Sequence, residues 1–350
     1  MQEKPQVSRL SRFLMTVASF VIVVAGIQAA ASILVPFFLA VFIATICMPL
    51  LNFTRRKHIP NALGIMFIIA IILASGVFVS SFLLTTLNEL SIKLPVYQTQ
   101  ITAKIRELLV WLNAQGIEIS STVVNDYFNP GTAFKLAGNM INGLRIALTN
   151  GFLVFLTVVF ILVEASGFPQ KVRAAIDDPE ESLGHLNQIA ENVNRYLAIK
   201  TVFSLMTGVI LGVMVGLVGI DFPLLWGLLA FLLNYVPNIG SIIAAIPPVI
   251  LALIQFGYPT AILVGLGFII VNVTISTGLE PRFMGRGLGL STLIVFLSLV
   301  FWGWVLGPIG MLLSVPLTMI IKVALESNDD TRWIAVLLGS AQTVSKHEKH

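Results

Sequence analysis

Long apolar runs dominate the chain, and six of them have the length of a membrane-crossing helix. A helix needs roughly 20 apolar residues to cross the hydrocarbon core of a bilayer. Runs of about this length occupy residues 13–31, 33–51, 61–87, 148–166, 201–220 and 258–277. Because backbone amides cannot be left unpaired in lipid, these runs are predicted to be helices rather than isolated strands. The pattern predicts an all-α, polytopic membrane protein with about six full spans.

The first run has features of both a membrane span and a secretory signal peptide. Arg9 and Arg12 precede it, and the three alanines at 29–31 resemble a cleavage site. The run is longer than the roughly 7–15 residues of a signal-peptide core, and a second run follows directly after Ser32. An uncleaved first helix is the favoured interpretation.

Two further apolar regions are interrupted by proline and glycine. Residues 222–256 are divided at 234–240, and residues 290–323 are divided at 303–310. Proline removes a helical hydrogen bond, and glycine lowers the cost of leaving helical geometry. Each region is predicted to be a broken helix or re-entrant hairpin, made of pieces too short for a comfortable full span. The two interruptions echo each other, as the halves of an inverted-repeat carrier do.

Basic residues are distributed unevenly between the two sides of this predicted topology. Sixteen of the 21 Lys and Arg residues fall on the side of the amino terminus, and the other five lie in the segment 88–150. An excess of basic residues marks cytoplasmic loops. Both termini are therefore predicted to be cytoplasmic and the segment 88–150 to be periplasmic. The net charge of +4 reflects this topology, so no nucleic-acid partner is expected.

Composition adds limits on the class of protein. Hydrophobic residues make up 57% of the 350 residues and charged residues only 11%, whereas soluble domains carry about 25% charged residues. The single cysteine excludes a disulfide scaffold. The sequence contains neither a Walker-type phosphate loop nor a Gly-x-Ser-x-Gly elbow, and its histidines lack metal-ligand spacing. An enzyme is not expected, nor is a cofactor or a metal.

Helical stripes of apolar residues also occur outside the predicted spans. Such a stripe packs on the protein's own core or on lipid headgroups, or it forms a seam between subunits. A seam between subunits would make the protein a homo-oligomer. The stripes consist of Ile101, Ile105, Leu108, Leu109 and Leu112; of Ala133, Ala137, Met140 and Leu144; and of Leu183, Leu186, Ala190, Val193 and Leu197.

Spans, loops and charges together predict five segments. Three transmembrane helices occupy residues 1–87, and a periplasmic helical segment occupies 88–150. A transmembrane helix with a cytoplasmic helical linker follows at 151–200. A transport core with the two broken hairpins occupies 201–326, and a cytoplasmic tail occupies 327–350.

Polar residues at the interruptions are the candidates for a substrate path. Interrupted membrane helices direct backbone groups and helix ends into a cavity, where transporters bind substrate. The candidates are Asn234, Pro237, Asn238, Gly240, Ser241, Asn272, Gly307, Pro308 and Gly310.

Four ionisable residues near span ends are candidates for a gate or a coupling site. An ionisable side chain deep in a span is costly and marks function. Glu164, Asp221 and Glu280 lie near the ends of their runs instead, so interfacial anchoring or capping is favoured over proton coupling. Glu280 and Arg282 form either a self-paired gate or a cytoplasmic turn, and the turn is the simpler interpretation.

Several long motifs resemble a known family. They are the segments 226–231, 234–241, 244–248, 279–291, 301–304 and 307–311. Together they resemble the autoinducer-2 exporter family of bacterial inner-membrane proteins, over most of the chain and most firmly over 201–326. The resemblance implies a multi-pass protein of the cell inner membrane that exports autoinducer-2, a small polar, furanone-type signal, and so modulates quorum sensing and biofilm formation. Other members resemble sodium(lithium)/proton antiporters, and no residue motif assigns the substrate.

Overall fold

The computed structural model describes residues 9–58, 60–115, 151–165, 167–175, 179–237, 239–284, 290–326 and 331–339. The regular structure of these residues is helical throughout, which confirms the all-α prediction. The elements are α1 (Arg9–Ala29), α2 (Ala31–Arg56), α3 (Asn61–Ala114), α6 (Gly151–Glu164), α7 (Phe168–Ala175), α8 (Pro179–Val218), α9 (Pro223–Leu233), α10 (Ile239–Phe256), α11 (Tyr258–Asn272), a π-helix (Val273–Leu279), α12 (Glu280–Met284), α13 (Thr292–Glu326) and α14 (Arg332–Leu338).

Six stretches within the described residues are long and apolar enough to cross a membrane. They are Ala31–Leu51, Ala62–Lys104, Ala190–Val218, Ile239–Phe256, Tyr258–Phe283 and Thr292–Glu326. Together with the shorter apolar helices, they confirm a polytopic helical membrane protein.

The assignment of spans differs from the prediction in three places. The first and fourth predicted spans are shorter apolar helices within the described residues, Leu14–Ala29 and Gly151–Glu164. Conversely, α10 reaches 18 residues, although the pieces of its region were expected to be too short. The reason is that proline does not end a membrane helix where neighbouring helices surround it. Thus α10 continues through Pro247 and Pro248.

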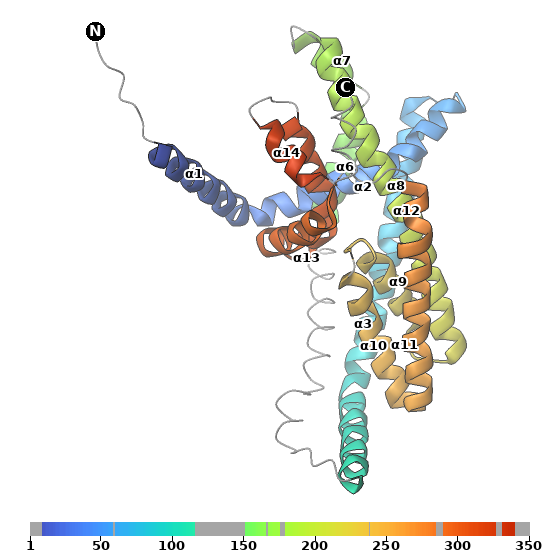
Figure 1. The fold of residues 1–350 in the computed structure, drawn as a ribbon. Helices are drawn as coiled ribbons and strands as arrows, with labels where there is room; N and C mark the ends of the chain where they lie inside the picture. Colours follow the sequence, from blue (N-terminus) through green and yellow to red (C-terminus); the bar gives the residue numbers. More distant parts are fainter. Residues whose placement is uncertain are drawn as a thin grey trace.

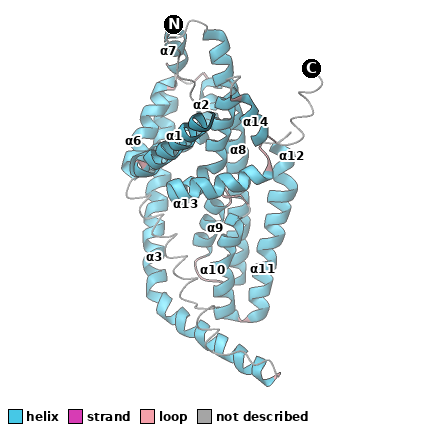
Figure 2. Ribbon diagram, turned by 60° about the vertical axis from the view of Figure 1, so that its left-hand side comes forward, coloured by secondary structure: helices cyan, strands magenta, loops and turns pink. Residues whose placement is uncertain are grey.

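The helices form an elongated bundle in which α3, α8, α9, α10 and α11 lie side by side (Figures 1 and 2). Their shared core contains Leu83, Val215, Trp226, Leu251 and Val264, one residue from each of these helices. Helix α1 projects to one side of the bundle and packs on α2 and α13. The start of α8 projects at one end of the molecule with α7, and the carboxyl-terminal part of α3 projects at the opposite end.

Helix α3 continues unbroken through residue 87, where the first predicted segment ends. Its 54 residues span about 80 Å at 1.5 Å per residue, far more than the hydrocarbon core requires. Ile101, from the first predicted stripe, is buried in the bundle core. The second stripe, Ala133 to Leu144, lies outside the described residues.

Helix α8 is similarly continuous, from Pro179 through the predicted boundary at 200. From the third predicted stripe, Leu197 is buried with Phe42 and Tyr235 of the same chain, and Val193 packs against that cluster. Ala190 is exposed. This part of the stripe therefore packs within the chain, and a seam between subunits stays a prediction.

Glycines allow α8 and α9 to approach backbone to backbone. A Cβ atom at Gly208 would lie 2.7 Å from the carbonyl oxygen of Gly227, and one at Gly227 would lie 2.8 Å from that of Gly208. Gly212 is also in contact, because its Cβ would lie 3.3 Å from Gly227 Cα. Spacing by four residues places Gly208 and Gly212 on one face of α8, as in small-residue interfaces of membrane helices.

Both predicted interruptions are present. Helix α9 ends at Leu233 and α10 begins at Ile239, while α13 departs from helical geometry at Gly307, with φ of 71°. The two breaks resemble each other in detail. A Cβ at Gly240 would overlap the carbonyl oxygen of Leu233, and one at Gly310 would overlap that of Trp302. Each break therefore requires a glycine where the new helix starts against the end of the old one.

Candidate functional site

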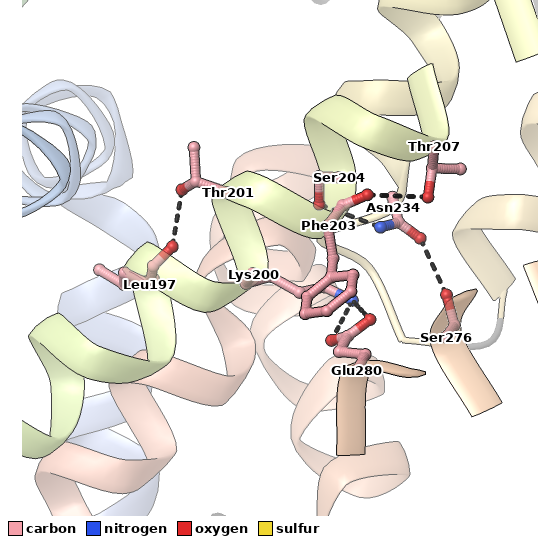
Figure 3. A network of polar contacts seen from close by, with 9 residues as sticks. All are labelled: Leu197, Lys200, Thr201, Phe203, Ser204, Thr207, Asn234, Ser276 and Glu280. Carbon is pink, nitrogen blue, oxygen red and sulfur yellow. Dashed lines mark hydrogen bonds and ion pairs between the residues drawn. The ribbon is translucent and has the colours of Figure 1, made fainter. Parts of the chain in front are cut away.

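Five polar side chains connect α8 with the π-helix and α12 across the first helix break (Figure 3). We call this cluster the polar ladder; it consists of Lys200, Ser204, Asn234, Ser276 and Glu280. Lys200 and Ser204 are one turn apart on α8, while Ser276 and Glu280 are four residues apart on the other side. The ladder therefore has two sets of contacts, one helical turn apart, which we call its rungs. The first joins Ser204, Asn234 and Ser276, and the second joins Lys200 and Glu280.

The first rung is formed by the amide of Asn234, which directly follows the end of α9. Its Nδ2 donates to Ser204 Oγ at 3.0 Å, and its Oδ1 accepts from Ser276 Oγ at 3.3 Å. Asn234 is only 4% exposed, so both contacts form away from water. A polar amide is thus held at the break entirely by hydroxyl partners on two other elements.

The second rung is an ion pair. Lys200 Nζ donates to both carboxylate oxygens of Glu280, at 2.8 and 3.0 Å, and each residue is 6% exposed. The two residues lie in the candidate spans Ala190–Val218 and Tyr258–Phe283. Two charges are therefore buried together in the apolar part of the bundle.

The π-helix joins the two rungs on one side. The backbone N–H of Glu280 donates to the carbonyl oxygen of Ile275, five residues earlier, at the end of this helix. Ser276 lies within the same turn. Single π-helical turns inside longer helices occur frequently at functional sites, because they redirect side chains relative to an α-helix.

Tyr235 extends the site toward α2. Its hydroxyl donates to Thr201 Oγ1 at 2.7 Å, and its ring meets that of Phe42 edge to face with centroids 5.4 Å apart. Ile309, from the break in α13, packs against the same apolar cluster. The two helix breaks are therefore connected through packed apolar side chains.

The predicted path residues fall into three groups. Asn234, Pro237 and Gly240 lie at the first break, and Ser241 is in the first turn of α10. Asn272 is half-buried and directly precedes the π-helix. Gly307, Pro308 and Gly310 form the break in α13, outside the polar ladder. Asn238 lies outside the described residues.

The structure corrects the interpretation of Glu280. Its carboxylate pairs with Lys200 of α8, and Arg282 is exposed. A self-paired gate between Glu280 and Arg282 is therefore wrong, because residues two positions apart on a helix do not face each other. Glu280 begins helix α12 rather than lying in a turn, and its side chain is buried; a position on the cytoplasmic side stays a prediction. Lys200, the last residue of the segment predicted to hold the cytoplasmic linker, is buried with it.

The other two acids lie at the surface. Glu164 ends α6 and accepts a hydrogen bond from Lys171, with both side chains exposed. An exposed pair of this kind contributes at most about 1 kcal/mol.

Asp221, between α8 and α9, accepts from Lys93 Nζ at 2.9 Å and from the Tyr97 hydroxyl of α3. Partial burial alone would raise the pKa of Asp221, but the Tyr97 hydroxyl and the Lys93 ammonium together hold it below its ordinary value.

Sequence reasoning missed Lys200, Ser204 and Ser276 as site residues. A signal for the first was present: Lys200 directly precedes the apolar run 201–220, and Ser204 follows it by four residues on the same face. The pairing itself spans 80 positions of sequence, so no local pattern indicates it. Among the described residues, no group of three or more His, Cys, Asp or Glu side chains has an arrangement that could hold a metal ion.

Comparison with known proteins identifies the family of this chain. Residues 13–328 match the AI-2E family transporters. The chain belongs to this family. It is 43% identical over 318 residues to the AI-2 transport protein TqsA of Escherichia coli (strain K12), covering 91% of this chain and 92% of that protein.

Two further relatives align over nearly their whole length. YhhT of Escherichia coli (strain K12) is 38% identical over 345 residues, covering 98% of this chain and 99% of that protein. A transport-related protein of Haemophilus influenzae is 36% identical over 339 residues, covering 95% and 97%. Neither name gives a substrate. The chain is thus a transport protein of the AI-2E family.

Proposed function

We propose that this AI-2E family transporter exports autoinducer-2 from the cytoplasm across the cell inner membrane, and so modulates quorum sensing and biofilm formation. The 43% identity to a relative named as an AI-2 transport protein supports this substrate. The proposal further includes cytoplasmic termini, a periplasmic segment 88–150 and a homo-oligomeric assembly. The uneven distribution of basic residues supports the orientation.

The observation that carries the proposal is the amide of Asn234, buried at a helix break and held only by hydroxyl groups. A hydroxylated signal offers the same donors and acceptors as Ser204 and Ser276. It can replace these serines one for one when the helices separate, so the amide stays hydrogen-bonded throughout. Exchange of neutral partners also avoids moving a net charge into the apolar bundle, which is the costly alternative.

A second candidate function, sodium(lithium)/proton antiport, gains support from one observation. Such an antiporter requires an acid in a sequestered site that alternates between a proton and a cation. Glu280 is buried within a candidate span. Its carboxylate, however, is occupied by the Lys200 ammonium, which a sodium ion would have to displace. Signal export therefore remains the preferred proposal.

Replacing Asn234 by leucine tests the proposed path. Asn234→Leu removes the amide and leaves Ser204 and Ser276 without their partner. A buried group left unpaired costs about 1–3 kcal/mol, and about 1.4 kcal/mol corresponds to a factor of ten. Autoinducer-2 efflux from proteoliposomes is expected to fall roughly tenfold.

Thr207→Val is the matched control for this variant. Thr207 is buried on the face of α8 that carries Ser204. Its hydroxyl donates to the carbonyl of Phe203 in its own helix, at 2.9 Å. Its replacement is expected to leave efflux near the wild-type rate. Wild-type efflux from a correctly inserted Asn234→Leu protein would remove Asn234 from the substrate path.

A further inference from the structure

The Lys200–Glu280 pair occupies a position where a charged pair adds little to folding. Both side chains are almost fully buried and lie in candidate spans. The desolvation of two charges offsets much of their attraction, and well-packed apolar side chains of similar size stabilise a core as well or better. Ionisable groups inside membrane spans typically line ion or proton pathways. The pair therefore points to a role in transport.

The chemistry of the pair favours a proton as its ligand. Both oxygens of Glu280 accept from Lys200 Nζ (Figure 3). Once Lys200 has moved away, a metal cation at this carboxylate would still need further oxygen ligands. The described residues contain no cluster of carboxylates that could provide them. A proton needs only one carboxylate oxygen, and it can bind as soon as Lys200 has moved away.

The surroundings of Glu280 make this exchange dependent on opening of the ladder. Lys200 faces Glu280 from α8, and the buried Tyr196 lies one turn before Lys200 on that helix. Arg282 on Glu280's own helix is exposed. A proton on Glu280 would leave the Lys200 ammonium unpaired in a dry site. Protonation must therefore coincide with admission of water to the ladder.

The π-helix connects this event to the proposed signal site. The backbone N–H of Glu280 is bonded to Ile275, and Ser276 in the same turn donates to the amide of Asn234. Movement of Glu280 away from Lys200 would therefore displace the turn that holds Asn234, so the two rungs are expected to open together.

We propose that Glu280 is a proton-exchange site that couples entry of one proton to export of one signal molecule, and that Lys200 is its internal counter-charge. A proton from the periplasm binds the Glu280 carboxylate when Lys200 is displaced. The proton is released to the cytoplasm when the ion pair forms again. This inference rests on the proposed function, since it assigns the driving force of that export.

The test uses the full-length protein in proteoliposomes with an imposed pH gradient. Movement of autoinducer-2 and of protons, the latter followed with an enclosed pH-sensitive dye, is measured in the same preparation. In the wild type, the gradient is expected to raise signal movement several-fold over the rate without a gradient. In Glu280→Gln, the ratio of these two rates is expected to fall to about one, whatever downhill rate remains.

A double variant separates coupling from a structural role. Lys200→Met/Glu280→Gln removes the unpaired lysine that the single variant leaves buried, so neither position carries a charge. It is expected to insert and unfold like the wild type yet to remain insensitive to the pH gradient. Thr207→Val, on the same helix face but outside the ladder, is expected to keep the full response.

The possible results distinguish failure of the proton coupling from failure of the proposed export. Signal movement in the wild type that ignores the pH gradient overturns the coupling and leaves export standing. A gradient response that persists in the double variant likewise overturns it and assigns the pair to folding. A wild type that moves no autoinducer-2 under any gradient contradicts export itself.

Discussion

Asp221 illustrates how single residues attach the long helix α3 to the bundle. Lys93 and Tyr97 of α3 both bond to its carboxylate, and its backbone N–H donates to Gln255 of α10 at 3.3 Å. The ammonium of Lys93 also lies over the ring of Phe222, 5.2 Å from its centroid. One residue, Asp221, therefore joins α3, the turn after α8 and the end of α10. At the next loop, the Tyr258 hydroxyl donates to the Lys104 carbonyl at 3.3 Å.

The stability contributed by Asp221 is expected to depend on pH. Because the pKa of Asp221 is lowered by folding, its contribution is complete above the ordinary aspartate value of about 3.9 and is lost as pH falls through the lower folded value. Asp221→Asn should therefore lower the Tm of the detergent-purified protein at pH 6. The difference in Tm between wild type and variant should shrink as the pH is lowered below 4. An equal difference at both pH values would contradict a role for the ionised carboxylate.

At the scale of elements, the packing of α9 on α8 depends on glycines, which have no side chain to separate the two helices. Gly227→Ala would place a methyl group 2.8 Å from the Gly208 carbonyl oxygen and 3.1 Å from Gly212 Cα. Both are backbone atoms, so the helices must separate. The free energy of unfolding is expected to fall by about 1–3 kcal/mol, measured by thermal or denaturant unfolding in detergent.

Gly216→Ala, on the same face of α8, is the matched control. Its new methyl group would lie 3.4 Å from Pro223 Cβ, an ordinary contact. Replacing a helical glycine by alanine otherwise stabilises a helix by roughly 0.5–1 kcal/mol. The Gly216→Ala protein should therefore be as stable as the wild type or more so. Equal losses in both variants would indicate a general effect of alanine rather than the close approach at Gly227.

The elements also show which parts of the fold were predictable. Apolar runs and the segments at Pro237 and Pro308 are local signals, and they correctly predicted helices and the two breaks. Helix lengths were harder to predict from the sequence, because packing around Pro248 decides that α10 continues. The polar ladder was not predictable, because Lys200 and Glu280 meet only after α8 and α12 have packed together. At Asn234 the sequence indicated the polar residue but neither of its two serine partners.

At the scale of the whole molecule, the two ends of the bundle provide a test of orientation. The carboxyl-terminal end of α3 and the helix α7 lie at opposite ends of the molecule (Figure 1). Gln115 directly follows α3, Ala174 is in α7, and both are exposed. The distribution of basic residues predicts that the first end faces the periplasm. In a Cys47→Ser background, an impermeant thiol reagent added to intact cells should label Gln115→Cys but not Ala174→Cys. Labelling of Ala174→Cys alone would reverse every assignment of sides.

The most direct test of the account compares two substrates on one preparation. The wild-type protein is reconstituted in proteoliposomes, and movement of autoinducer-2 and sodium-driven proton movement are both measured against protein-free vesicles. The account predicts autoinducer-2 movement well above the protein-free rate, with no sodium/proton exchange. Robust sodium/proton exchange together with no autoinducer-2 movement would contradict it.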